Sequence, residues 1–301
     1  MKDLILHGML CDRQIRFAAI SGKTMVTEAQ KTHMLSHVAT AALGRQLLMT
    51  SIVASQLKNA GDTVTTVIAG NGPAGNLVCV GRFGGLVKGY ATEPEVELPL
   101  RSDGKLDVGG YVGPQGKLTL IRDLGLKEPY VGMCNLVSGE IAEDFAQYFT
   151  ASEQQPSLVY LGVREEAESG SVIGAGGILI QPLPSCPDSE ITRVENAAAR
   201  IPELTRRLSE GESIETVLFD LLGGLDPEIT ERIELAYRCD CTRDRLERAL
   251  LSIGEEELND ILANEGEAEL TCQFCLKKYH FDRAELTDLL RAAKGEESDG
   301  E

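Results

Sequence analysis

The sequence has no long hydrophobic run, and this absence argues against a membrane protein. Within its 301 residues no segment approaches the roughly 20 apolar residues that a membrane-spanning helix needs. The first residues, Met1 to His7, also lack the apolar stretch of a secretory signal peptide. We therefore expect a cytoplasmic protein that has no membrane partner.

Positive charge is also scarce. The sequence has 29 Lys and Arg against 47 Asp and Glu, which gives a formal net charge of −18 at pH 7. Most of this imbalance lies in residues 201–301, with 12 basic against 26 acidic side chains. Because nucleic-acid phosphates repel such a surface, we expect no nucleic-acid partner. Arg243, Arg245 and Arg248 alternate with acidic residues, so we interpret them as a solvated helix face.

Motifs of nucleotide binding and catalysis are missing as well. The loop from Asn71 to Asn76 is rich in glycine, but no Lys-Ser or Lys-Thr pair follows it, so we predict a turn and not a phosphate site. Ser152-Glu153-Gln154 has no histidine close in sequence that could serve as a base. We expect a protein that is not an enzyme.

The sequence has four histidines, and they form no convincing metal site. His33 and His37 lie four residues apart on a predicted helix, but no third ligand is near them in sequence. We interpret both as core or surface residues. His280 follows a cysteine pair and offers an alternative metal ligand, although its simplest interpretation is an exposed strand residue.

The first 184 residues predict one α+β domain. With 43% hydrophobic residues the chain is globular and long enough for two or three domains. Apolar residues at helical spacing from Thr27 to Lys58 predict one long helix or two, and a further helix is expected at 140–149. Short β-branched runs between glycines predict strands at Thr63–Ala69, Leu77–Val80, Leu118–Ile121, Ser157–Val163 and Gly177–Gln181.

Prolines at 182, 184 and 187 then mark a domain boundary. We predict a helical linker over 185–236, with a new helix starting at Asp226-Pro227. One linker helix carries an apolar stripe that requires cover, formed by Ile214, Val217, Leu218, Leu221 and Leu222. A small domain is predicted at 237–290, followed by a disordered tail at 291–301.

The small domain has readable helix signals. Thr242 is the expected N-cap of a helix that ends at Ser252, and Asp282 is the expected N-cap of the last helix. Between them we predict a helix at Glu255–Ala263 and strands at Ala268–Thr271 and Leu276–Phe281. Fewer than 60 residues make a marginal core.

The cysteine pattern of this domain is the most informative feature of the sequence. Cys239-x-Cys241 and Cys272-x-x-Cys275 form two close pairs, and together they offer the four sulfur ligands that Zn²⁺ prefers. Thiolates so close together can also be oxidised to disulfides. The other four cysteines, Cys11, Cys79, Cys134 and Cys186, lie singly in apolar segments, as free thiols do in a reducing compartment.

These residues resemble the redox-regulated chaperones of the heat-shock protein 33 (33 kDa chaperonin) family. The similarity rests on the two cysteine pairs, on the Arg238–Leu250 segment that contains the first pair, and on Tyr279 and Phe281 beyond the second. It continues upstream through motifs at Gly72–Leu77, Gly85–Tyr90, Pro129–Gly132, Tyr148–Gln154 and Gly176–Pro184. Lys88 stands where the family pattern has arginine.

The resemblance implies an ATP-independent holdase for unfolded client proteins, inactive when reduced and zinc-bound. It implies one Zn²⁺ per chain, held by Cys239, Cys241, Cys272 and Cys275. Oxidation would join Cys239–Cys241 and Cys272–Cys275 as disulfides, with zinc release, local unfolding and a homodimeric active form. The implied fold is an α+β substrate-binding core, a helical linker and a small zinc-binding redox-switch domain.

Two other readings of the cysteines remain. A zinc-ribbon adaptor would bind protein or nucleic acid without redox control. A thiol–disulfide oxidoreductase would use Cys272-x-x-Cys275, but its cysteines would normally begin a helix, whereas these lie between predicted strands.

Overall fold

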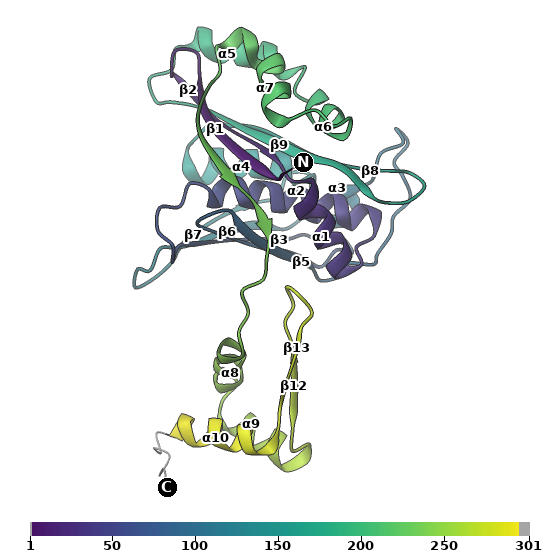
Figure 1. The fold of residues 1–301 in the computed structure, drawn as a ribbon, viewed down its shortest axis with the longest axis vertical. Helices are drawn as coiled ribbons and strands as arrows, with labels where there is room; N and C mark the ends of the chain where they lie inside the picture. Colours follow the sequence, from purple (N-terminus) through teal and green to yellow (C-terminus); the bar gives the residue numbers. More distant parts are fainter. Residues whose placement is uncertain (1, 295–301) are drawn as a thin grey trace. The chain divides into compact units, whose positions relative to one another are not determined.

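The computed structural model describes residues 2–294, and the chain divides into two compact units, Met1–Arg238 and Cys239–Glu301. Helices and antiparallel sheets both contribute to the fold, which confirms the α+β class (Figure 1). The first unit extends beyond residue 184 because the segment up to Arg238 packs on the two sheets of the core.

The first sheet of unit 1 has five antiparallel strands in the order β10-β1-β2-β9-β8. Its strands are β1 (Leu4–Leu10), β2 (Ile15–Ser21), β8 (Leu158–Glu165), β9 (Val172–Pro182) and β10 (Glu228–Glu234). Consecutive side chains of a strand point to opposite faces, and the neighbours Ile5 and Leu6 are both buried, in two different hydrophobic clusters. Both faces of this sheet are therefore covered.

The second sheet has six strands in the order β11-β5-β4-β3-β6-β7. Its strands are β3 (Thr63–Ala69), β4 (Asn76–Arg82), β5 (Leu86–Ala91), β6 (Lys117–Asp123), β7 (Tyr130–Asn135) and β11 (Ala236–Tyr237). Along β3 the residues Val64, Thr66 and Ile68 are buried while their neighbours are half-exposed. This alternation is typical of a sheet with one covered face.

A central helix, α2 (His37–Ala54), fills the space between the two sheets of unit 1 (Figure 1). Sixteen of its 18 residues are buried, and it contacts β3, β4 and β5 on one side and β2, β8 and β9 on the other. The preceding helix, α1 (Lys23–His33), ends at Met34 in a left-handed conformation. The helical segment predicted from Thr27 to Lys58 is thus two helices, one of the two options.

Three further helices cover the other face of the first sheet: α5 (Asp188–Ala198), α6 (Glu203–Ser209) and α7 (Ile214–Leu222). The apolar stripe of α7 is buried in the cluster that also contains Phe17 and Ile178. The helix expected from Asp226-Pro227 is wrong, because this segment forms strand β10, which pairs with β1. Unit 1 also contains α3 (Val108–Val112), α4 (Ala142–Glu153) and the 3₁₀ turn η1 (Gly223–Leu225).

Unit 2 follows the predicted plan closely. It contains α8 (Arg243–Ser252), α9 (Glu255–Asn264), the hairpin β12 (Ala268–Thr271) and β13 (Lys278–Phe281), and α10 (Arg283–Lys294). Both expected N-caps are confirmed: Thr242 accepts from the Arg245 N–H at 3.4 Å, and Asp282 from the Glu285 N–H at 2.9 Å.

The core of unit 2 is small. Its hydrophobic cluster contains six buried side chains among the described residues: Leu250, Leu258, Tyr279, Phe281, Leu286 and Leu290. The first four residues of the predicted tail, 291–294, belong to α10, and residues 295–301 lie outside the described residues. A core of this size leaves unit 2 dependent on additional stabilisation.

Candidate metal centre

Two loops of unit 2 carry the four cysteines. Cys239 and Cys241 lie in the extended segment before α8, and Cys272 and Cys275 lie in the turn between β12 and β13. The turn is tight: the Cys272 N–H donates to the Lys277 carbonyl at 3.0 Å, and the Leu276 N–H donates to the Cys272 carbonyl at 2.8 Å. The hairpin therefore fixes both cysteines of the second pair on one short loop.

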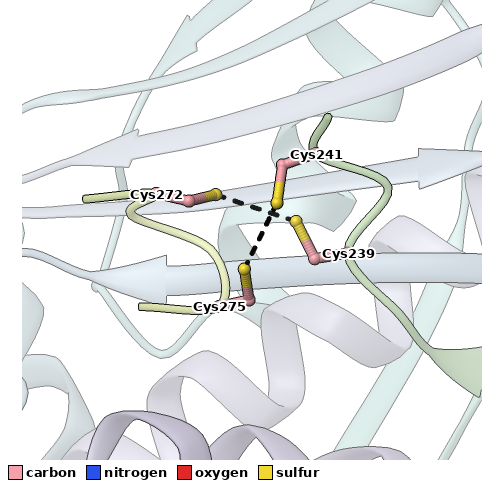
Figure 2. Close-up of side chains that lie close together, drawn as sticks. All are labelled: Cys239, Cys241, Cys272 and Cys275. Carbon is pink, nitrogen blue, oxygen red and sulfur yellow. Dashed lines mark hydrogen bonds between the residues drawn. The ribbon is translucent and has the colours of Figure 1, made fainter. Parts of the chain in front are cut away.

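The four sulfur atoms converge, as Figure 2 shows. All of them lie within 4.8 Å of one another, with Sγ–Sγ distances of 3.4 Å for Cys241 and Cys275 and 3.8 Å for Cys239 and Cys272. Four sulfurs at about 2.3 Å from a tetrahedral ion lie about 3.8 Å apart, so the observed arrangement fits such an ion. Each of these two distances joins one cysteine from each loop, and all four cysteines are free thiols.

The donor set determines which ions suit this centre. Four soft thiolates in a closed tetrahedral arrangement favour Zn²⁺ and exclude the hard, oxygen-seeking Mg²⁺ and Ca²⁺. Cys272 is buried and the other three cysteines are half-buried. The cluster is thus shielded, yet small oxidants can still reach its sulfurs.

The thiols of the cluster differ in acidity. Burial opposes ionisation of Cys241, but hydrogen bonds from Tyr279 and the other three cysteines outweigh it and lower its pKa to about 7. Burial raises the pKa of Cys275, although the backbone N–H of Lys277 acts in the opposite direction. In the metal-free cluster, Cys241 therefore ionises more readily than Cys275.

Residues around the cluster tie its two loops together. The Arg243 guanidinium donates to the His280 carbonyl at 2.8 Å, pairs with Glu285 at 2.6 Å and lies 4.3 Å from the centre of the Phe281 ring. Arg245 pairs with Asp240 at 2.8 Å. Arg243 and Arg245 therefore make structural contacts within unit 2, whereas the sequence suggested only that they lie on a solvated helix face.

Sequence reasoning did not foresee the contact between Tyr279 and the cluster. The Tyr279 hydroxyl lies 3.2 Å from the Cys241 sulfur. The alternation of polar and aromatic residues over Lys278–Phe281 indicates that Tyr279 lies on the inner face of a strand, but it does not indicate a partner on the other loop.

The histidines lie apart from this centre. His33 is buried and its Nε2 lies 3.0 Å from the Tyr237 hydroxyl, whereas the exposed His37 pairs with Glu165 at 3.1 Å. His280 is exposed and lies 3.1 Å from Glu267. Among the residues described, the cysteines form the one group of three or more potential ligands close enough to share an ion.

The glycine-rich loop at Asn71–Asn76 is a packed turn, as predicted. The Gly72 N–H donates to the Val112 carbonyl and the Ala74 N–H to the Tyr111 carbonyl, both at 2.9 Å. A side chain at Gly72 would place its Cβ 2.4 Å from the Tyr111 carbonyl oxygen. These amides are therefore engaged within the protein and do not face an open phosphate cradle.

Unit 1 contains one serine–histidine contact that the sequence did not reveal. His7 Nε2 lies 2.8 Å from Ser55 Oγ at the edge of a cavity of about 470 Å³. The Ser55 hydroxyl donates to the Ile52 carbonyl at 2.6 Å, so its proton is directed at the helix end and not at the ring. Burial lowers the pKa of His7, against the influence of Glu231. The pair therefore links strand β1 to the end of helix α2.

None of the described helices combines the length and the apolar character that a bilayer crossing requires.

Comparisons with known proteins agree with the architecture. A sequence model described as Hsp33 protein matches residues 3–282. The 33 kDa chaperonin of Clostridioides difficile is 41% identical over 97% of this chain and 99% of its own, and that of Alkaliphilus oremlandii is 43% identical over 96% of each. The crystal structure of the 33 kDa chaperonin from Thermotoga maritima superposes with a TM-score of 0.87 at 36% identity, covering 98% of this chain and all of that one. The chain therefore belongs to the Hsp33 family.

Proposed function

We propose that the protein is an ATP-independent holdase whose binding of unfolded proteins is switched on by oxidation of Cys239, Cys241, Cys272 and Cys275. The observation that carries this proposal is the convergence of four sulfurs within a unit that has a core of only six buried side chains. Membership of a family whose relatives are named chaperonins supports the chaperone activity.

In the reduced form the four cysteines hold one Zn²⁺ per chain. Sulfur spacing and the soft donor set support this ion. Zinc bound to four thiolates would add stability that the unit's small core does not supply. This bound state is the inactive one.

Oxidation by hydrogen peroxide would convert the four thiolates into disulfides. A sulfur lone pair attacks one peroxide oxygen, the O–O bond breaks, hydroxide leaves, and the sulfur becomes a sulfenic acid after a two-electron oxidation. A neighbouring thiolate displaces the second hydroxide and forms the S–S bond. Near-neighbour pairing, Cys239–Cys241 and Cys272–Cys275, consumes two peroxides per chain and leaves the two loops of unit 2 unlinked.

Unlinked loops would let unit 2 unfold. The chain just before Cys239 is held to unit 1 by the short strand β11, where the Tyr237 hydroxyl contacts His33 and donates to the Gly89 carbonyl at 2.8 Å. Strand β10 lies at a sheet edge, and only Ile229 and Ile233 of its seven residues are partly buried against the core. Its ion pairs, such as Lys2 with Glu234, are exposed and contribute about 0–1 kcal/mol each. Release of β10 would loosen α7, whose apolar stripe then becomes available to hydrophobic segments of unfolded proteins.

Charge and thiol content indicate the compartment and the partners of the protein. The eight cysteines are all free, which suits a reducing cytoplasm. The net charge of −18 disfavours nucleic acid as a partner. The active, oxidised form is a homodimer, as the family resemblance implies, and size-exclusion chromatography of reduced and oxidised protein checks this state.

An aggregation assay tests the proposal. Reduced, zinc-loaded protein and peroxide-treated protein are each added, without nucleotide, to a thermally unfolding client, and light scattering is recorded. We expect only the oxidised protein to suppress aggregation, and peptide mapping to find the two near-neighbour disulfides. Equal activity of both forms would contradict redox control and favour a static zinc-ribbon adaptor.

A further inference from the structure

The Tyr279 side chain is placed to act directly on one sulfur of the cluster. It is 6% exposed, and its hydroxyl oxygen lies 3.2 Å from Cys241 Sγ and 3.3 Å from the Cys241 carbonyl oxygen. We propose that Tyr279 is a positioning residue that donates a hydrogen bond to the metal-bound Cys241 sulfur and thereby slows its oxidation. The inference rests on the proposed redox function and names a residue that sets how readily the cluster is oxidised.

The direction of the hydrogen bond follows from the proton inventory. A thiolate bound to a metal has no proton and can only accept, whereas a phenol has one proton to donate. The carbonyl oxygen of Cys241 competes for that proton, but a charged sulfur is the stronger acceptor. The Tyr279 hydroxyl therefore directs its proton mainly to the sulfur.

The hairpin holds the Tyr279 ring rigidly. Tyr279 pairs with Leu270 across β12 and β13, its ring belongs to the core of unit 2, and the Lys277 ammonium lies 4.8 Å from the ring centre. The same hairpin carries Cys272 and Cys275. One structural element thus supplies two of the sulfurs and also the donor to a third, which comes from the other loop.

The effect on reactivity follows from the lone pairs of sulfur. Attack on a hydroperoxide uses a sulfur lone pair to form the S–O bond while the O–O bond breaks and hydroxide departs. A hydrogen-bond donor that contacts the sulfur lowers the electron density on that sulfur. Part of this hydrogen bond is lost in the transition state, so the donor slows the attack. Hydrogen bonds to charged groups are strong enough to account for a change of about three- to tenfold in rate. Residues that hydrogen-bond to the ligands of a metal are known to tune those ligands in this way.

The test compares Tyr279→Phe with Asp282→Ala in the full-length, metal-loaded protein. The first variant removes only the hydroxyl. The second removes the N-cap of α10, where Asp282 accepts from the Glu285 N–H at 2.9 Å, and so weakens unit 2 without touching a sulfur. The rates of thiol loss and zinc release in excess hydrogen peroxide are measured, as is the sulfur-to-metal charge-transfer band of the cobalt(II)-substituted protein.

We expect Tyr279→Phe to oxidise about three- to tenfold faster and to shift the charge-transfer band to lower energy, because an unbonded sulfur is easier to oxidise. Asp282→Ala should leave the band unchanged. Replacement of Tyr279 by 3-fluorotyrosine, a stronger donor that keeps the ring, should slow oxidation and shift the band the other way. This second replacement decides the matter if the phenylalanine variant fails to fold.

Two results would overturn the inference: an unchanged band in Tyr279→Phe, or an oxidation rate equal to that of the wild type. These results are distinct from failure of the proposed function. Oxidised wild-type protein that releases zinc but holds no client would contradict the holdase and leave the role of Tyr279 intact. A wild type that resists peroxide would contradict the proposed redox switch, whereas an unchanged band in Tyr279→Phe would still overturn the role of Tyr279.

Discussion

Removal of the metal from the reduced protein should unfold unit 2 and leave unit 1 folded. Six buried hydrophobic side chains, at about 1.5–3 kcal/mol each, contribute about 9–18 kcal/mol before the entropy of ordering the unit is subtracted. A zinc contribution of about 10–16 kcal/mol is as large as this gross contribution of the core. Loss of the metal therefore removes about half of what offsets the ordering entropy, and the metal-free unit should be mostly unfolded.

Hydrogen exchange with mass spectrometry measures this directly. A chelator is added under a thiol reductant, so that metal loss occurs without disulfide formation. We expect protection to fall across residues 239–291, whereas α2 and the central strands β3 and β9 keep theirs. The 40 buried residues of the main core of unit 1 are independent of the metal. Unchanged protection of 239–291 in metal-free, reduced protein would refute the reasoning, because the hydrophobic core alone would then suffice.

The remaining predictions concern ligands, nucleotide and pH. Cys272→Ser should lower zinc affinity at least about 100-fold in a chelator competition, because a hydroxyl binds Zn²⁺ much more weakly than a thiolate does. The matched control Cys186→Ser should bind zinc normally. Equal affinities of the two variants would exclude Cys272 as a ligand. Aggregation suppression by oxidised protein should be identical with and without ATP, because the Gly72 and Ala74 amides are engaged by carbonyl groups; dependence on ATP would contradict the holdase. Acidification of the reduced protein should release zinc, because the thiolate ligands take up protons as pH falls. Unit 2 then loses the stability that the metal supplies. Zinc release is monitored with a metal indicator, and zinc retention at a pH that protonates free thiols would argue against a thiolate site.

The helix starts, the strand and the cysteine pairs that depend on neighbouring residues alone could be predicted from the sequence. Thr242 and Asp282 mark helix starts because a single side-chain oxygen caps each one, and both caps are present. Strand β3 could be predicted at its observed bounds because residues 63–69 form a run of β-branched residues between glycines. The four site cysteines could be identified because pairs at metal-ligand spacing are rare.

Elements that depend on distant partners could not be predicted. Ile229 and Ile233 lie four residues apart behind Pro227, which is a helix pattern, yet the segment is a strand because β1 offers it an unpaired edge. The contact between Tyr279 and Cys241 joins residues 38 positions apart. No local pattern encodes such a pairing, since it arises only when the hairpin and the first cysteine loop fold together.

Oxidation of the cysteine cluster, metal release and client binding should be one event. It can be followed by stepwise titration of the reduced, zinc-loaded protein with hydrogen peroxide, with free thiols, free zinc and suppression of client aggregation measured on the same samples. We expect zinc release and holdase activity to rise together, to completion at two disulfides per chain, and a thiol reductant added with zinc to reverse both. Full aggregation suppression before any zinc is released, or complete zinc release without any suppression, would contradict it.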